Sequence, residues 1–184
     1  MKRYVVRKNL GWFFLFFLLT LFLYGFMSCA DNSNNKESSN NSILNWLPYD
    51  QALAKSKIEN IPTLIYFYSD QCGWCKKLEN ETFNDQKVWD LMSQKFSIVK
   101  INSNSTRFVI ENGKKMTEKQ LSEQIYQVKG NPTVWFLADD HKRIASLPGY
   151  VKSDVFVNVL NYIKDGYYKN ITFQKYMEIE QNKP

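Results

Sequence analysis

Residues 63–75 read TLIYFYSDQCGWC, a short apolar run followed at once by two closely spaced cysteines. The run Thr63–Tyr68 is rich in β-branched and aromatic residues and is too short for a helix, so it predicts a buried strand. Residues 72–81 then carry a helical pattern. The two cysteines, Cys72 and Cys75, are therefore expected where a strand ends and the first turn of a helix begins.

The position of this cysteine pair predicts redox chemistry. Unpaired backbone N–H groups and the helix dipole favour negative charge at a helix N-terminus, so Cys72 should form a thiolate at a lower pH than a free cysteine. Cys75 lies one turn later and can attack a mixed disulfide formed at Cys72. We assign Cys72 as the nucleophile and Cys75 as the resolving thiol. Gly73 is expected to keep the turn tight, and Trp74 to place an exposed apolar ring beside the sulfur.

The same two cysteines could instead form a structural disulfide or supply half of the ligands of a zinc site. A zinc site needs about four ligands. Beyond the pair, the chain supplies one further cysteine, Cys29, and one histidine, His141. The pattern therefore favours a redox pair over a zinc site, and we expect neither a bound metal nor another cofactor. A purely structural disulfide stays open as an alternative.

The segments around the pair alternate between strands and helices. Strands are predicted at residues 63–68, 96–101, 133–137 and 143–147, and helices at residues 49–60, 72–81, 85–95, 152–164 and 172–180. A further helix is expected to start at the capping box Thr117–Gln120 and to end at Gly130. Residues 108–110 should form a small hairpin that turns at residues 111–113. This order describes an α/β protein with a central mixed sheet and helices on both faces.

The N-terminus has the order typical of an export signal, a basic segment followed by an apolar one. Residues 2–8 are basic, and residues 10–27 form an uncharged run of 18 residues. About 20 apolar residues span a bilayer, so residues 1–28 are expected to be an uncleaved anchor with its basic flank in the cytoplasm, or a signal peptide cut before Cys29. The stretch FMSC at residues 26–29 resembles the lipobox of bacterial lipoproteins, which implies a lipid on Cys29. A fully released protein is the third possibility.

A polar segment separates this N-terminus from the folded part. Residues 30–42 read ADNSNNKESSNNS and contain no apolar residue larger than alanine. Residues 29–42 are therefore predicted to be a flexible tether, and residues 43–184 the folded domain. Both membrane-bound alternatives place that domain in the cell envelope, on the periplasmic or extracytoplasmic face.

The net charge of +6 does not indicate a nucleic-acid partner. Four of the 24 basic side chains and none of the 18 acidic ones lie in residues 1–28, which leaves 20 against 18 for the rest of the chain. A balanced surface gives no electrostatic reason to expect a polyanion.

Three stretches carry a resemblance to a known family: FYSDQCGWCKKLENETF at residues 67–83, GNPTVWFL at residues 130–137 and LPGY at residues 147–150. They resemble the thioredoxin superfamily, in particular its exported SoxW-type members, and the resemblance covers about residues 45–168. It implies a thioredoxin fold and thiol–disulfide exchange. It also implies that Pro132 is a cis-proline facing the dithiol. The segment Asn131, Pro132 and Thr133 would then bind substrate, with the Asn131 backbone pairing with an extended chain.

This chain departs from thioredoxin in ways that affect the chemistry. The buried acid that the family carries six residues before the first cysteine is replaced by Tyr66, whereas the lysine of the neighbouring strand is matched by Lys100. The resemblance leaves open whether Tyr66, water or Glu79 moves the proton of the resolving thiol. Gly-Trp replaces Gly-Pro between the cysteines, and the lack of a histidine there favours a reductant over an oxidant.

Two segments are expected to extend the family's fold. Residues 103–128 are longer than their thioredoxin equivalent and form an insertion before the cis-proline loop. Residues 172–180 are expected to add a short helical extension at the C-terminus.

The sequence thus predicts a membrane-tethered thiol–disulfide oxidoreductase of protein-disulfide reductase type that acts on exported proteins. Its expected partners are the thiols and disulfides of exported proteins, and an upstream electron donor in the membrane or periplasm. A second hypothesis is a non-catalytic module of the same fold that delivers copper, or binds a peptide, in a membrane complex. Copper is considered because soft thiolates suit Cu(I).

Overall fold

The computed structural model describes residues 44–183. The predicted signal or anchor at residues 1–28, the tether at residues 29–42 and the lipid site at Cys29 lie outside the described residues. Within the described part of the chain, no helix is both long enough and apolar enough to cross a membrane.

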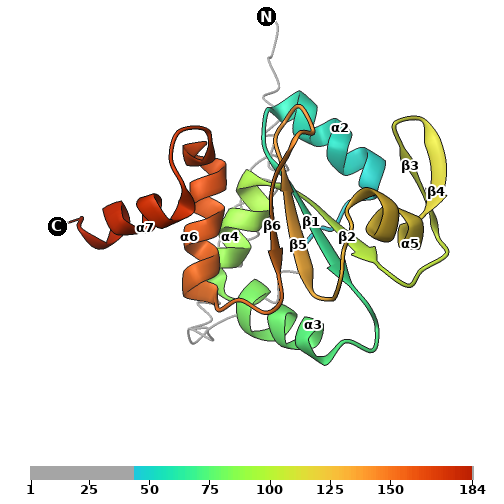
Figure 1. Cartoon of the computed structure of the whole chain (residues 1–184), viewed down its shortest axis with the longest axis horizontal. Coiled ribbons are helices and arrows are strands. Elements are labelled where there is room, and N and C mark those ends of the chain that lie inside the picture. The colour runs from blue at the N-terminus through green and yellow to red at the C-terminus, as the bar shows by residue number, and fades with distance from the viewer. Residues whose placement is uncertain (1–43, 184) are drawn as a thin grey trace, which may run out of the picture. The chain divides into compact units, whose positions relative to one another are not determined.

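A four-stranded mixed sheet forms the centre of the domain (Figure 1). Its strand order is β2-β1-β5-β6. Strand β1 (Thr63–Tyr68) runs parallel to β2 (Ser97–Asn102) and antiparallel to β5 (Thr133–Leu137), which pairs antiparallel with β6 (Arg143–Pro148). The predicted thioredoxin fold with a mixed sheet is confirmed.

Helices cover both faces of this sheet because successive side chains of β1 alternate between two cores. Leu64 and Tyr66 contribute to one core, Ile65 and Phe67 to the other, and all four are fully buried. Burying a side chain of this size contributes roughly 1.5–3 kcal/mol. Figure 1 shows α4 (Gln86–Lys95) and α6 (Ser153–Lys164) on one side of the sheet, and α2 (Tyr49–Glu59) on the other.

Two predicted helix boundaries are explained by their caps and packing. The Asp85 carboxylate accepts the backbone N–H of Lys87 at 3.0 Å and of Val88 at 3.2 Å, which fixes the start of α4. The C-terminal extension contains a short 3₁₀ turn (Tyr167–Lys169) and α7 (Phe173–Gln181). The buried Tyr176 ring of α7 packs against Tyr162 of α6 at a centroid distance of 5.5 Å.

The insertion before the cis-proline loop begins with the predicted hairpin. Strands β3 (Phe108–Glu111) and β4 (Lys114–Thr117) pair antiparallel, as a separate two-stranded sheet. A capping box between Thr117 and Gln120 then starts α5 (Glu118–Gln120), which continues as the π-helical segment η2 (Leu121–Ile125).

The predicted end of this helix at Gly130 is wrong, because the helical segment stops at Ile125. Tyr126 turns into the core, where its hydroxyl lies 2.8 Å from the Tyr49 hydroxyl and its ring lies 5.2 Å from Phe67. Gln127 then adopts a left-handed conformation with φ 51°, which ends the helix and directs the chain toward the cis-proline loop.

Candidate active site

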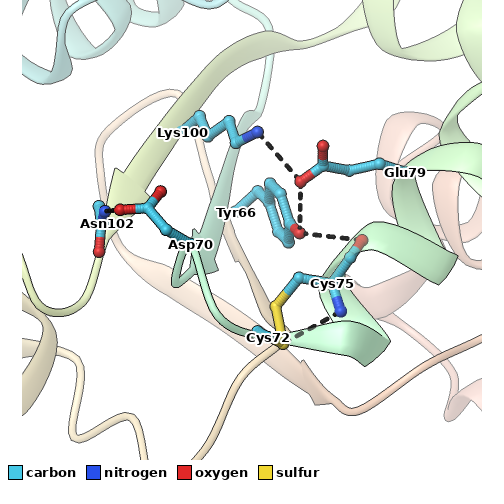
Figure 2. A network of polar contacts seen from close by, with 7 residues as sticks. All are labelled: Tyr66, Asp70, Cys72, Cys75, Glu79, Lys100 and Asn102. Carbon is cyan, nitrogen blue, oxygen red and sulfur yellow. Dashed lines mark hydrogen bonds and ion pairs between the residues drawn. A yellow bond between two sulfur atoms is a disulfide. The ribbon is translucent and has the colours of Figure 1, made fainter.

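The strand-to-helix junction after β1 places both cysteines of the CGWC motif. Cys72 is the N-cap of α3 (Gly73–Lys77), and its Sγ accepts the backbone N–H of Cys75 at 3.0 Å. The two cysteines form a disulfide with their Cα atoms 5.2 Å apart (Figure 2). A sulfur in this position receives an N–H group that has no partner within the helix. The local structure therefore favours negative charge on Cys72 once the disulfide is reduced.

The two sulfur-bearing residues differ in their access to solvent. Cys75 is 1% exposed, whereas Cys72 is half-buried. An incoming disulfide can therefore reach Cys72 far more readily than Cys75. This asymmetry fits the roles predicted from the sequence, with an accessible nucleophile and a resolving thiol protected behind it.

The residues between the cysteines behave differently from each other. Trp74 is 59% exposed, as expected for an apolar ring beside the sulfur. Gly73 is the first residue of α3, directly after the N-cap Cys72. A Cβ added to Gly73 would meet no atom within 4 Å, and its φ lies outside the left-handed region, so neither space nor backbone conformation demands glycine there.

An aromatic cluster adjoins the motif and was only partly foreseen. The Trp74 ring lies 5.9 Å from the ring of Tyr150, and Lys77 Nζ lies 5.2 Å and 4.9 Å from the two ring centroids. The Tyr150 hydroxyl donates to the Glu81 carboxylate at 2.6 Å. Tyr150 belongs to the LPGY stretch singled out in the sequence, but its contact with Trp74, 76 residues away, required the fold. Together Trp74, Lys77 and Tyr150 form what we call the aromatic platform.

The cis-proline loop lies at the same end of the sheet as the cysteines. The peptide bond between Asn131 and Pro132 is cis, as the family resemblance implied. Thr133 at the start of β5 pairs with Phe67 near the end of β1. The cis-proline loop therefore enters the sheet at the same end at which the chain leaves β1 toward the CGWC motif. The Gly149 N–H donates to the Pro132 carbonyl at 2.8 Å, which connects the loop to the neighbouring Tyr150 of the aromatic platform.

Side chains also hold the loop in place. The Ser103 hydroxyl donates to the Asn131 side-chain oxygen at 3.1 Å, and the Thr133 hydroxyl donates to the Gly130 carbonyl at 2.7 Å. The predicted substrate-binding residues Asn131, Pro132 and Thr133 line a cavity of about 380 Å³ that Trp135 also borders. The three residues are thus brought together beside a hollow.

A polar network lies behind Cys75 (Figure 2). The Tyr66 hydroxyl donates to Glu79 Oε1 at 2.9 Å and lies 3.4 Å from the Cys75 carbonyl oxygen. Lys100 Nζ donates to the same Glu79 oxygen at 3.0 Å. Tyr66 and Lys100 are paired in the register of β1 and β2, while Glu79 comes from the helical segment η1 (Leu78–Phe83) after α3.

Burial sets the protonation of the tyrosine in this network. Tyr66 is fully buried, and desolvation together with the neighbouring Glu79 raises the pKa of its hydroxyl well above its ordinary value. The Tyr66 hydroxyl therefore stays neutral and acts as a hydrogen-bond donor across the physiological range. The sequence identified Tyr66, Glu79 and Lys100 as relevant, but not their joint arrangement.

Potential metal ligands are sparse in the part of the chain that the structure describes. Across residues 44–183, no group of three or more histidine, cysteine, aspartate or glutamate side chains is placed to hold a metal ion.

The dithiol position and the cis-proline loop on this sheet define the fold of thioredoxin-like disulfide oxidoreductases. Residues 49–164 match the model of the family described as "Thioredoxin-like domain". The chain therefore belongs to the thioredoxin-like domain family.

Solved structures show the same fold at low sequence identity. A thioredoxin-fold protein from Helicobacter pylori is 24% identical with a TM-score of 0.58, and the match covers 67% of this chain and 86% of that one. A DsbH oxidoreductase is 18% identical with a TM-score of 0.53, and the match covers 74% of this chain and 95% of that one. The reduced C-terminal domain of Neisseria meningitidis DsbD is 23% identical with a TM-score of 0.51, and the match covers 62% of this chain and 92% of that domain. At these identities the comparison supports the fold alone.

Among curated proteins, the chain is 32% identical over 59 residues to human Spermatogenesis-associated protein 20. That match covers 32% of this chain and 8% of the human protein. The similarity therefore concerns a small part of a much longer protein.

Proposed function

We propose that this protein is a membrane-tethered thiol–disulfide oxidoreductase that acts on exported proteins, preferentially as a reductant. The observation that carries the proposal is the asymmetry of the disulfide. Cys72 is accessible and its sulfur accepts a backbone N–H at the start of a helix, while Cys75 is buried one turn later. This is the arrangement that a nucleophile and a resolving thiol require.

The reaction follows from this geometry. The Cys72 thiolate attacks a substrate disulfide, forming a mixed disulfide and releasing one substrate thiolate. The Cys75 sulfur then attacks Cys72 Sγ, the bond to the substrate breaks, and the second substrate thiol leaves. Two electrons pass from the protein dithiol to the substrate, and an upstream donor must reduce the Cys72–Cys75 disulfide again.

The surroundings of Cys72 suit a polypeptide substrate. The peptide bond between Asn131 and Pro132 is cis, and we infer that the Asn131 backbone pairs with an extended substrate chain in the manner of an added strand. The aromatic platform offers apolar area beside the sulfur, and Lys77 adds a positive charge to it. Substrates with apolar side chains next to the cysteine are the best fit to this surface.

The tether and the location rest on the N-terminal sequence. Residues 2–8 are basic, residues 10–27 are uncharged and largely apolar, and residues 30–42 are polar. The FMSC stretch supports a lipid on Cys29 over an uncleaved anchor. Exported proteins and a donor in the membrane or periplasm are the partners that such a location would supply.

The function is tested by insulin reduction in the presence of a thiol donor. The wild-type protein should accelerate the reaction, Cys72→Ser should abolish it, and Cys75→Ser should accumulate a mixed disulfide with the substrate that mass spectrometry detects. Activity that survives Cys72→Ser would overturn the proposal. Equilibration with glutathione gives the direction, since a potential near about −270 mV indicates a reductant and one near about −120 mV an oxidant.

Copper delivery is a second candidate, because the reduced motif would present two soft thiolates within one helical turn. Stoichiometric Cu(I) binding by the reduced protein, together with negligible disulfide exchange, would favour copper delivery over the oxidoreductase.

A further inference from the structure

The hairpin of the insertion carries exposed apolar side chains that the proposed chemistry does not use. Phe108 and Ile110 of β3 are 59% and 45% exposed, although both are large and apolar. Because they lie two residues apart on one strand, they point to the same side of the hairpin. Lys115 of β4 is paired with Ile110, and its Nζ lies 4.2 Å from the centroid of the Phe108 ring. We call Phe108, Ile110 and Lys115 the outer hairpin face.

The opposite face of the hairpin packs against the domain. Val109 contacts the core that contains Phe67, and the Glu111 carboxylate accepts the hydroxyl of the buried Tyr49 at 2.7 Å. The hairpin is therefore held to the domain through its inner face. Since the acidic side chain of β3 is bound there, the outer hairpin face is apolar and basic.

The charges around this face suit an anionic surface. Lys115 is exposed on the face itself, and Lys114 is exposed beside it at the start of β4. The neighbouring Arg107, by contrast, is bound to the buried carboxylate of Glu118. Exposed lysines next to exposed apolar side chains are typical of surfaces that bind anionic lipid, where the apolar groups enter the headgroup region and the amines contact phosphates.

The predicted tether brings a lipid surface within reach, and this step rests on the membrane attachment in the proposed function. Residues 29–42 separate the expected lipid or anchor from the folded domain, and a coil of this length spans roughly 20 Å. The folded chain begins close to the hairpin, because Trp46, Leu47 and Phe108 border the same cavity of about 430 Å³. A membrane that holds residue 29 is therefore near the outer hairpin face.

A protein partner fits this face less well than a membrane does. A specific protein–protein interface buries about 800 Å² on each partner, which is more than three side chains supply. A membrane requires less, because the tether raises the effective concentration of the face to about the millimolar range. Weak contacts are then enough to hold the face on the lipid for much of the time.

We propose that the outer hairpin face docks on the anionic phospholipid surface of the membrane to which the chain is tethered. Phe108 and Ile110 enter the headgroup region, and Lys114 and Lys115 pair with lipid phosphates. Figure 1 shows the hairpin beside α2 and apart from α3, the helix that begins after Cys72. Docking therefore orients the domain and leaves the dithiol uncovered for its substrates.

Hydrogen–deuterium exchange of the full chain, reconstituted in vesicles, tests the docking. Vesicles of phosphatidylcholine alone are compared with vesicles that contain about 30% phosphatidylglycerol. Peptides that cover residues 108–117 should exchange at least about twofold more slowly in the anionic vesicles, because a millimolar affinity at a millimolar effective concentration keeps the face bound about half of the time. Phe108→Thr combined with Ile110→Thr should remove this difference, and threonine keeps the preference for a strand.

Val155→Thr is the matched control. Val155 is 40% exposed on α6, which covers the face of the sheet opposite to α2 and should not contact the membrane (Figure 1). This variant should therefore retain the difference between the two kinds of vesicle. Exchange at residues 63–68 of β1 reports folding, and it should be as slow in the double variant as in wild type.

Three results would overturn the inference. Residues 108–117 that exchange equally in both kinds of vesicle would remove the contact with anionic lipid, and so would a difference that persists in the double variant. Protection that appears in detergent solution and grows with protein concentration would show that a second copy of the chain covers the face.

Vesicle sedimentation separates the inference from the proposed attachment. If the double variant still sediments with the vesicles but wild type shows no protection of the hairpin, the anchor stands and the docking fails. If wild type sediments and the double variant does not, the face binds lipid and the proposed tether fails. Insulin reduction by the same variants tests the proposed chemistry independently, because the hairpin is apart from the dithiol.

Discussion

Gly149 donates its backbone N–H to the Pro132 carbonyl over 2.8 Å and so joins the turn after β6 to the cis-proline loop. The bond depends on an unusual backbone conformation, since Gly149 has a φ of 84°. Residues that carry a Cβ rarely adopt a positive φ of this size, which is why glycine suits the position between Pro148 and Tyr150. The link aligns the loop that is proposed to bind substrate with the aromatic platform.

Gly149→Ala is expected to lower the free energy of unfolding by about 1–2 kcal/mol, because an L-residue is strained at this φ. No atom lies within 4 Å of the added Cβ, so backbone strain alone is responsible. Urea unfolding measures the change. Gly73→Ala is the matched control, since its Cβ also meets open space but its φ is ordinary, and it should leave stability unchanged or raise it. Equal losses in both variants would contradict the argument.

Trp74→Ala is expected to weaken substrate binding without unfolding the domain. Trp74 is largely exposed, so its removal costs little stability, but it takes away the ring that contacts Tyr150 and Lys77 beside the sulfur. KM for insulin should rise about fivefold or more, as for the loss of an aromatic contact residue. The reaction with glutathione disulfide, which is too small to cover the platform, should change much less.

The control for this substitution is Ile58→Ala, which removes an exposed apolar side chain from α2. It should leave KM for insulin unchanged. An unchanged KM in Trp74→Ala as well would show that substrates do not use the aromatic platform.

The sheet was predictable because its signals are local. The bounds of β1 and β5 follow from apolar runs of a length that suits strands, and they match the observed Thr63–Tyr68 and Thr133–Leu137. The helix after Thr117 began as predicted at its capping box, but its end depends on Tyr126 finding a place beside Tyr49. That contact joins residues far apart in the chain, so the helix end predicted at Gly130 lies several residues too late.

The site was predictable where a motif carried it and not where strand register did. Cys72 and Cys75 stand in a short motif with its own physical meaning. The meeting of Tyr66, Lys100 and Glu79 requires the register between β1 and β2 as well as the direction of the helix after Cys75. From the sequence, Tyr66, water and Glu79 were alternatives for moving the proton, and Lys100 was matched to the family's lysine, but nothing in the sequence showed that the three side chains meet.

Arg107→Ala is expected to destabilise the domain by about 1–3 kcal/mol. Glu118 is 1% exposed, and its Oε1 accepts Arg107 Nε at 3.0 Å as well as Arg107 Nη2. Its Oε2 is buried and has no hydrogen-bond partner among residues 44–183, so loss of the arginine would leave a buried carboxylate without compensation. Thermal and urea unfolding measure the loss.

The matched control for the arginine is Lys119→Ala, because Lys119 pairs with Glu123 on an exposed helix face and should contribute little. Adding Glu118→Leu to Arg107→Ala should recover part of the lost stability by removing the buried charge. If the double variant is less stable than Arg107→Ala alone, the unpaired carboxylate is not the cause.

The buried tyrosine pair predicts a loss of stability in alkali. Burial raises the pKa of Tyr126 to about 12, and its hydroxyl lies 2.8 Å from that of Tyr49. In the unfolded chain tyrosine ionises near about pH 10, so above that pH the unfolded state binds fewer protons than the folded state. The contribution of Tyr126 to the free energy of unfolding is therefore complete below about pH 10 and is lost as the pH rises toward 12.

Tyr126→Phe, which cannot ionise at this position, should unfold more easily than wild type at neutral pH. The difference in unfolding free energy should shrink between about pH 10 and 12, and a difference that stays constant with pH would contradict this origin.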